Sequence, residues 1–584
     1  MTGMRIDVFL DLTSRIAHEA RQIIYRSIEK VGDPVEVRYR FVVSDHASEI
    51  AARAAYAAEQ LDLTEAMIDA LANYEGQYNE ASMLGLLDEL SGDRGVSGQI
   101  LQAQEFLSRL EEDRHLASAA NLAVMPGLTI DDMPYNGAWD EDALFEAMLE
   151  RSGRRVEHMI DGFFRWGAAA AFALLLATAV ALLVANLGGY QWYEALRHLE
   201  FGLTLDSHGF RLSAEAWIND GLMSLFFLLI GIEIKREILF GELSDVKRAA
   251  LPVIGAFGGM VIPAAIYALV NWNTPTSNAW GVPMATDIAF TLGLLTLLAS
   301  RVPFSLKVFV SALAVADDLG AIVVIAIFYG HGFDGSAFVV ATLIVAIMGI
   351  LNRGRVYATS VYLFLGAGLW FFIHEAGLHA TLAGVITAIM LPSRPSGNLV
   401  GAAEQARVLF DQEIAHARGN PGSQGMRAEA LHNLQGSIDR LREPSYHLEY
   451  ALERWVNFLI LPLFAFYNTG ISFADGLSLD TTHSIGIVLG LCVGKPLGIV
   501  GACWIATKLK IAQISEDIQW RHLIGAGALA GVGFTMSIVV ASSAFAEEYI
   551  TGAKLSILIA SVVSASLGMI VLAWPSKIRQ PNRD

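Results

Sequence analysis

Residues 304–329 read FSLKVFVSALAVADDLGAIVVIAIFY, and this stretch decides what kind of protein the chain is. An apolar run of about 20 residues is the length that a helix needs to cross the hydrocarbon core of a bilayer. Two adjacent carboxylates, Asp317 and Asp318, stand near its centre. An ionisable side chain at that depth is costly, and it is usually functional. The stretch therefore predicts a membrane-spanning helix that carries a functional site.

The composition of the whole chain agrees with a large membrane domain. Of the 584 residues, 54% are hydrophobic and only 17% are charged, whereas soluble domains are about 25% charged. Residues 1–150 hold 28 acidic and 11 basic residues, a balance of −17 against −19 for the whole chain. The charge thus predicts an acidic soluble domain joined to a nearly neutral membrane domain. An acidic domain also argues against nucleic acid as a partner.

Twelve segments of the chain are candidates for membrane-spanning helices. They are residues 165–186, 214–239, 249–271, 281–298, 304–329, 336–351, 357–374, 379–392, 453–471, 484–506, 522–545 and 553–574. The predicted division is a domain of residues 1–150, a linker of 151–164, a membrane domain of 165–575 with a polar loop at 393–448, and a tail of 576–584. Within the loop we expect a helix near 426–442.

Basic residues orient the predicted bundle. Lysines and arginines cluster in the loops at one end, including Lys247, Arg248, Arg301, Arg353 and Lys508, and the opposite loops hold little beyond Arg197, Arg211 and Lys554. Cytoplasmic loops carry this excess of positive charge. We therefore expect an inner-membrane protein with both termini in the cytoplasm, and no signal peptide is visible at the start of the chain.

The first 150 residues read as a mixed α/β domain. Residues 5–12 and 35–43 are strand-like, 16–31 has helical spacing, and 47–120 reads as several helices. Met125-Pro126, a short strand at 128–130 and a helix from Asp140 follow. This order resembles a thioredoxin-like domain of the DsbA type, in which Met125-Pro126 would be the cis-proline loop; otherwise the proline simply marks a turn. The only cysteines are Cys492 and Cys503, so redox catalysis by this domain is not expected.

Further ionisable residues lie inside the apolar segments. Asp287 stands in AWGVPMATDIAFTLG and Lys495 in LCVGKPLGIV. Asp317 and Asp318 point about 100° apart on a helix, so one can line a pathway while the other reaches a neighbouring helix or Lys495. A carboxylate that holds either a cation or a proton is the minimal device for exchange, and a desolvated lysine can add a second proton. The alternative is a set of buried structural ion pairs.

Two of the segments are predicted to be interrupted. Gly281 and Pro283 precede Thr286-Asp287 in one, and four glycines from Gly525 to Gly533 occur in another. Interrupted helices expose charged half-helix ends, which an Asp or a Lys can balance. A pair of broken helices in corresponding halves points to the binding site of an inverted-repeat transporter.

Seven blocks of sequence, in order, resemble the NhaA-type bacterial sodium/proton antiporters. They are WINDGLMSLFFLLIGIEIKREILFGEL (217–243), ATDIAFTLG (285–293), ADDLGAIVVIAIFY (316–329), HATLAGVI (379–386), LPLFAFYNTGIS (461–472), GKPLGI (494–499) and GVGFTMSIVVASSAF (531–545). The resemblance covers about Phe163 to Trp574. It implies a polytopic α-helical fold of about 12 spans with inverted repeats and two interrupted helices that cross.

The resemblance also implies residue roles. Asp318 would be the principal sodium and proton site, Asp317 its partner, and Lys495 the lysine of electrogenic exchange, while Thr286 and Asp287 would lie at the helix crossing. The cytoplasmic pH-sensing cluster would be Glu233, Arg236, Glu237 and Glu449. Glu453 stands where relatives often carry a histidine. Lys235 is instead expected to be an interfacial anchor, and His379 a packed, hydrogen-bonded residue.

The predicted function is electrogenic Na⁺(Li⁺)/H⁺ antiport for pH and sodium homeostasis, regulated by pH, by a homodimer without a cofactor. Residues Gly188–Ala214 would be the outside loop that could pair between protomers. Two alternative functions make different demands on the sequence. A solute symporter on a similar scaffold would need neither Asp317 nor Asp318, and a membrane-tethered thioredoxin-like sensor would need a thiol in residues 1–150. No GxxxxGK[ST] motif occurs, so the expected driving force is the proton gradient rather than ATP.

Overall fold

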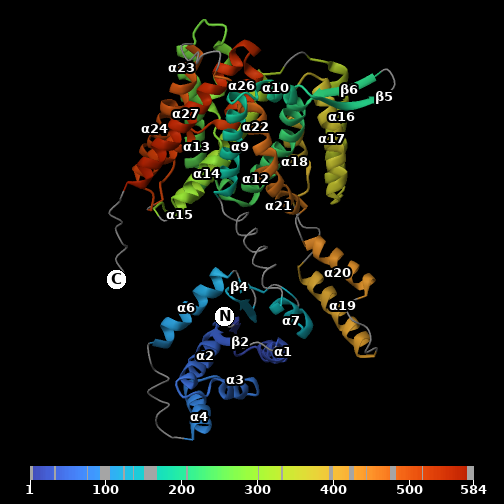
Figure 1. The fold of residues 1–584 in the computed structure, drawn as a ribbon, viewed down its shortest axis with the longest axis vertical. Helices are drawn as coiled ribbons and strands as arrows, with labels where there is room; N and C mark the ends of the chain where they lie inside the picture. The colour runs from blue at the N-terminus through green and yellow to red at the C-terminus, as the bar shows by residue number, and fades with distance from the viewer. Residues whose placement is uncertain are drawn as a thin grey trace. The chain divides into compact units, whose positions relative to one another are not determined.

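The computed structural model divides the chain into two compact units, Met1–Phe163 and Phe164–Asp584, and each is described by itself (Figure 1). The structure describes residues 4–31, 35–74, 76–92, 105–120, 122, 125–135, 137, 139–149, 168–205, 208–299, 301–330, 333–393, 399–419, 427–441, 444–473, 482–515 and 517–574. The predicted linker 151–164 and tail 576–584 lie outside these residues.

The first unit is a four-stranded sheet with helices. Its elements are β1 (Met4–Leu10), α1 (Arg15–Val31), β2 (Val35–Phe41), α2 (His46–Glu59), α3 (Thr64–Ala72), α4 (Glu80–Ser91), α6 (Glu105–Ala119), β3 (Gly127–Ile130), β4 (Met133–Pro134) and α7 (Glu141–Leu149). The strand order is β2-β1-β3-β4, with β1 parallel to β2 and antiparallel to β3, and β3 antiparallel to β4. This is the strand order of a thioredoxin-like fold, as the sequence predicts.

The apolar run of β1 explains its central place in the sheet. Ile6 pairs with Val37 of β2 on one side and with Ile130 of β3 on the other, and all three strands are hydrogen-bonded through it. A strand with neighbours on both sides and both faces covered needs apolar residues along its length. Met125-Pro126 precedes β3 and its peptide bond is cis, as expected for the loop of this fold.

The turn after β1 occupies the position of a redox pair, and polar contacts fill it. Asp11 accepts hydrogen bonds from the backbone N–H of Thr13 at 3.1 Å, from the Thr13 hydroxyl at 2.7 Å and from the Ser44 hydroxyl at 2.6 Å. The chain has no cysteine before Cys492. The first unit therefore keeps the thioredoxin-like scaffold without a sulfur nucleophile.

Asp113 of α6 is a buried polar anchor for this unit. It accepts hydrogen bonds from the Phe41 N–H at 2.9 Å, from the Arg40 guanidinium at 3.0 Å and from the Tyr56 hydroxyl. Burial, followed by the contact with Asp113, raises the pKa of Tyr56 well above its ordinary value, so the phenol remains a donor. One carboxylate thus ties β2 and α2 to α6.

We expect Asp113→Ala to lower the stability of the first unit by about 3 kcal/mol, because it leaves the buried donors of Phe41 and Tyr56 unpaired and takes one of its carboxylate partners from Arg40. Hydrogen exchange at the β2 amides of the full chain measures this change. Glu112→Ala, an exposed neighbour on the same helix, is the matched control. Equal protection of β2 in the two variants would contradict the role given to Asp113.

The second unit is a bundle of helices. Its long helices are α9 (Ala169–Asn186), α12 (Met223–Phe240), α13 (Val246–Val270), α15 (Phe304–Phe328), α16 (Gly335–Arg353), α17 (Thr359–Glu375), α24 (Lys495–Lys508) and α27 (Glu547–Ala573). Shorter helices are α10 (Tyr190–Arg197), α11 (Ala214–Ala216), α14 (Ile288–Leu297), α18 (Leu382–Met390), α21 (Pro444–Trp455), α22 (Leu461–Thr469), α23 (Thr482–Leu489), α25 (Trp520–Ala530) and α26 (Phe534–Ala544). Short π-helical stretches at 217–222, 456–460 and 490–494 join neighbouring helices.

Seven helical segments of the described residues are long and apolar enough to cross a membrane, and the bent pair of α25 and α26 brings the number to eight. All twelve predicted segments contain helix, although α18 has only nine residues. The protein is thus a multi-pass membrane protein, and the count of twelve spans stays a prediction.

Two segments of the bundle are interrupted where the sequence predicts. A 3₁₀ stretch, Ser277–Met284, and α14 are separated by Ala285, Thr286 and Asp287. Residues 531–533 separate α25 from α26, which are bent by 45° from one another. Because Gly and Pro do not sustain a helix, the helix of each segment ends inside the bundle and a new helix begins there.

The packing of α13 on α24 holds this part of the bundle together. A Cβ on Gly258 would overlap the backbone carbonyl of Gly498, and a Cβ on Gly498 would overlap that of Gly258. Glycine pairs let two helix backbones approach this closely in membranes. Lys495 begins α24 one turn before Gly498, so the close packing fixes its position.

Two connections differ from the sequence prediction. In 393–448 the expected helix is α20 (Ala428–Leu441), but a second helix, α19 (Leu399–Gly419), precedes it. In Gly188–Ala214, expected to be a loop, α10 is followed by the antiparallel strands β5 (Glu200–Leu205) and β6 (His208–Ser213) (Figure 1). Both regions are polar, so hydropathy alone did not reveal their regular structure.

Candidate functional site

Lys495 and Asp317 form a buried ion pair within the second unit. The ammonium Nζ of Lys495, at the start of α24, lies 2.6 Å from Oδ2 of Asp317 on α15. The lysine is 0% and the aspartate 1% exposed. Two charges this deeply buried persist only when paired and hydrogen-bonded. The expectation that one of the two adjacent aspartates reaches Lys495 is confirmed.

Thr286 links this ion pair to one of the helix breaks. Its hydroxyl accepts a hydrogen bond from Lys495 Nζ at 2.8 Å and donates one to the carbonyl of Ala530 at 2.9 Å. Ala530 is the last residue of α25. The last carbonyls of a helix have no hydrogen-bond partner within that helix. The lysine therefore reaches the negative end of a half-helix through Thr286 rather than by direct contact.

Asp287 satisfies the beginnings of two half-helices at once. Its Oδ1 accepts from the backbone N–H of Phe290 in α14 at 3.0 Å, and its Oδ2 accepts from the N–H and hydroxyl of Thr535 in α26 at 3.0 and 2.5 Å. The N–H of Asp287 itself donates to the Val532 carbonyl at 2.7 Å. A carboxylate is well suited to this place because both helix N-termini carry partial positive charge.

Asp318 differs from its neighbour because its charge has no partner. It is 1% exposed, and neither of its carboxylate oxygens accepts a hydrogen bond from a described residue. Oδ1 of Asp317 is likewise without a hydrogen bond. A buried, unpaired carboxylate is costly unless it takes up a proton or a cation. The arrangement therefore provides a place for either of these two charges.

The site offers few protein ligands to an ion. Among the described residues, no group of three or more His, Cys, Asp or Glu gathers where it could hold a metal. Two carboxylates can still attract a hard cation, which prefers oxygen ligands.

The four residues of the predicted pH-sensing cluster lie close together, because Glu233 interacts with the charges of Glu449, Arg236 and Glu237. Arg236 on α12 forms an ion pair with Oε1 of Glu449 on α21. Glu237 accepts from the backbone N–H of Glu242 at 2.8 Å, the first N–H of the short 3₁₀ turn Glu242–Ser244 that follows α12. Glu233 lies one turn before Glu237 on α12 and shares its face. The second oxygen of Glu449 is buried without a hydrogen bond.

Two neighbouring expectations have different outcomes. The ammonium of Lys235 donates to the carbonyls of Ile389 at 2.7 Å, of Ala388 at 3.4 Å and of Leu391 at the end of α18, and its role as an interfacial anchor stays a prediction. His379 is hydrogen-bonded through Nε2 to the Tyr329 carbonyl at 2.6 Å, which confirms the packed interpretation. The contact of Lys235 with α18 could not be predicted, because sequence alone does not reveal a helix end beside it.

The contact of Thr535 with Asp287 and the buried position of Lys554 were not predicted from the sequence. Thr535 follows Gly533 by two residues, so its N–H lies in the first turn of a helix and has no acceptor within that helix. This signal could have pointed to a carboxylate partner. Lys554 was assigned to an outside loop, but it lies in α27 and is 5% exposed. Its neighbour Asn468 lies in the block LPLFAFYNTGIS (461–472), and the sequence predicts no particular role for it.

Comparisons with known proteins agree with this geometry. The family model described as Na⁺/H⁺ antiporter 1 matches residues 161–572. The Na⁺/H⁺ antiporter NhaA of Nitrosospira multiformis is 37% identical over 511 residues, covering 84% of this chain and 81% of that protein. The NhaA of Helicobacter pylori is 42% identical over 405 residues, covering 68% of this chain and 91% of that protein.

The first unit is similar to other solved structures. A thioredoxin-like oxidoreductase from Silicibacter pomeroyi is 22% identical, with 26% of this chain and 87% of that chain covered and a TM-score of 0.24. Residues 164–584 make up less than 84% of the chain, so the match to the Nitrosospira antiporter extends into the first unit.

With its family match, its two broken helices and its buried Asp–Lys pair, the chain belongs to the Na⁺/H⁺ antiporter 1 family.

Proposed function

We propose that this Na⁺/H⁺ antiporter binds its ions at Asp317 and Asp318, with Lys495, Thr286 and Asp287 holding the site in shape. The observation that carries the proposal is Asp318, which is buried with both oxygens unpaired beside the Lys495–Asp317 pair. Sodium and lithium are both hard cations that such carboxylates bind. The chain's own side chains supply this chemistry, so the proposal needs no cofactor.

The proposed cycle alternates between a proton-loaded and a sodium-loaded site. With protons bound, Asp318 is neutral, and Lys495 is charged and paired with Asp317. Sodium entering from the cytoplasm displaces the proton of Asp318 and competes with the ammonium for Asp317, so Lys495 loses a proton as well. Two protons then replace one sodium ion, and each cycle moves one net charge. The exchange is therefore electrogenic, and the membrane potential drives it.

Asp318→Asn tests the ion site. An amide cannot release a proton or bind sodium as a carboxylate does, so we expect exchange to fall at least about 100-fold, roughly the loss of one strong charge contact. Sodium-induced dequenching of a ΔpH dye in everted vesicles, from pH 6.5 to 9, measures it. Asp334→Asn, at an exposed capping aspartate before α16, is the matched control. Equal exchange by the two variants would remove Asp318 from the mechanism.

Lys495→Gln tests the second proton. The amide can still donate to Asp317 and Thr286 but cannot release a proton, so one proton should replace one sodium ion. We expect sodium-driven exchange to continue without generating a membrane potential, which a potential-sensitive dye in proteoliposomes reports. The parent protein in the same liposomes is the reference. Potential of the parental size in Lys495→Gln would contradict the assignment of the second proton to this lysine.

We also propose the surroundings in which the exchanger works. The basic residues at one end of the bundle support an inner-membrane location with both termini in the cytoplasm, and export of sodium for pH and sodium homeostasis. Residues 1–150 would form a redox-inactive cytoplasmic domain, 151–164 a linker and 393–448 a cytoplasmic loop. The β5–β6 hairpin supplies an edge that a second copy can pair with, which supports a homodimer.

Regulation by pH is proposed to act through Glu233, Arg236, Glu237 and Glu449. Protonation of Glu449 would break its ion pair with Arg236 and loosen α21 from α12. Glu449→Gln imitates the protonated form, so we expect the activation profile to move toward alkaline pH by about half a unit or more. The pH dependence of dequenching measures the shift. Glu404→Gln, on the exposed face of α19, is the control, and an unshifted profile in Glu449→Gln would refute the role.

A further inference from the structure

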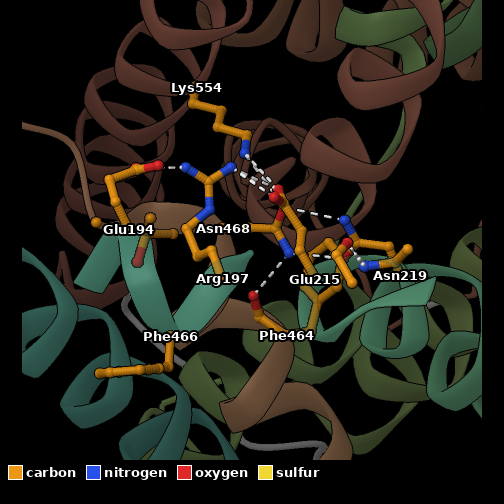
Figure 2. A network of polar contacts seen from close by, with 12 residues as sticks. Glu194, Arg197, Glu215, Asn219, Phe464, Phe466, Asn468 and Lys554 are labelled. Carbon is orange, nitrogen blue, oxygen red and sulfur yellow. Dashed lines mark hydrogen bonds and ion pairs between the residues drawn. The ribbon is translucent and has the colours of Figure 1, made fainter. Parts of the chain in front are cut away.

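A second polar cluster lies away from the ion site, where α10, α11, α22 and α27 meet (Figure 2). We call it the junction cluster, and its members are Glu194, Arg197, Glu215, Asn219, Asn468 and Lys554. None of them belongs to the proposed ion site or to the pH-sensing cluster. It occurs at the end of the bundle from which the β5–β6 hairpin extends (Figure 1).

The helices of the second unit form two groups at this point. One group holds the ion site: α13 packs on α15 and α24, α24 on α25, and α27 on α23, α25 and α26. The other group packs α22 on α9, α12 on α18, and α21 on α12, and the two groups touch where α12 packs on α15 and α14 on α9. Asn468 and Glu215 belong to the second group, whereas Lys554 comes from α27 of the first. Lys554 therefore reaches from the ion-binding group to the other group.

Lys554 makes two contacts across this boundary. Its ammonium lies 3.2 Å from Oδ1 of Asn468 and 3.9 Å from Oε1 of Glu215. Lys554 is 5% and Asn468 2% exposed. Figure 2 shows the lysine extending alone from one side toward the amide and carboxylate. A buried ammonium has to keep such partners, because an isolated buried charge is strongly unfavourable.

The partners of Lys554 are held in place without it. Arg197 donates to both oxygens of Glu215 at 2.7 Å and to Glu194 at 2.7 Å. Asn468 donates to Asn219 at 2.7 Å and to the Phe464 carbonyl at 3.0 Å. When Lys554 moves away, Glu215 keeps its bidentate ion pair and Asn468 keeps its two hydrogen bonds. The second group thus presents a preformed receptor that the lysine can leave and re-enter.

The tie at the other end of the bundle is of a different kind. Arg236 and Glu449 join α12 to α21, and Lys235 joins α12 to α18. These helices pack on one another within the second group, so their contacts do not cross the boundary. A relative movement of the two groups would leave both contacts intact, whereas it would have to break those of Lys554.

We propose that Lys554, seated between Asn468 and Glu215, is a latch that closes the ion pathway at this end and sets the balance between the two access states. This inference rests on the proposed function, because a latch matters only if the two groups alternate. Lys554 is a positioning residue that touches no ion. The structure is the latched state, and opening of this end requires Lys554 to leave Asn468 and Glu215.

Lys554→Gln tests the latch by measuring sodium affinity from each membrane face. A ligand's apparent affinity rises with the fraction of protein open to it. We therefore expect the apparent KM for sodium at the Lys554 face to fall about threefold or more, with no fall at the opposite face. Initial rates in right-side-out and everted vesicles of the full chain give the two values.

Matched variants separate a latch from a general structural role. Lys554→Arg keeps the charge and the donors, so both KM values should stay near those of the parent. His198→Gln, at the exposed rim beside Glu194, should change neither value. Lys554→Gln combined with Glu215→Gln should shift the KM no further than Lys554→Gln alone, since both remove one contact. If Lys554→Gln does not accumulate, Asn468→Ala replaces it in the test. This substitution leaves every charge in place, and we expect the same one-sided shift in KM.

The proposal is overturned by equal KM changes at the two faces, or by full additivity of the Lys554 and Glu215 substitutions. It is also overturned if activity in Lys554→Gln falls only in proportion to a lower melting temperature. The parent and Asp318→Asn are measured in the same vesicles. If those two proteins do not differ, the ion-site assignment fails, and that result is distinguishable from any outcome that concerns only the Lys554 variants.

Discussion

Two helices that stop inside an apolar bundle leave N–H and C=O groups unbonded, and the second unit depends on how these are satisfied. No water in a bilayer core can replace a missing backbone hydrogen bond. Asp287 accepts from the starting turns of both α14 and α26, and Thr286 donates to the last carbonyl of α25. Two consecutive side chains therefore hold both kinds of helix end, which is why the crossing can exist at this place.

This solution has a consequence for the proposed ion site. With Asp287 committed to helix N-termini and Asp317 to Lys495, the neighbouring Asp318 is left without a hydrogen bond. The structure thus concentrates unsatisfied charge on one carboxylate of three. A proton and a cation can each satisfy that carboxylate, but they exclude one another. Competition between the two ions then follows from how the backbone is supported, rather than from a separate binding pocket.

Much of this arrangement could be predicted from sequence, because its signals are local. The apolar runs gave the helices, Gly281, Pro283 and the glycines to Gly533 gave the breaks, and the adjacency of Asp317 and Asp318 required them to diverge. The alternation of apolar residues predicted strands of the first unit, and the order of elements along the chain, with Met125-Pro126, indicated its fold. Contacts between distant segments could not be predicted in this way. Lys235 on the end of α18, Thr535 on Asp287 and Lys554 on Asn468 each depend on a helix end brought near by tertiary packing.

The same packing suggests why the ion site can move as one body. Gly258 and Gly498 bring α13 and α24 into backbone contact, and α24 carries Lys495. α13 also packs on α15, which carries both aspartates. Distances within the site are then fixed by the closest-packed helices of the unit, whereas Lys554 reaches across the boundary toward α22 with a single long side chain. Alternating access requires the groups to separate without disturbing the carboxylates of the proposed ion site, and a side-chain contact can break and re-form more readily than the backbone packing of α13 on α24.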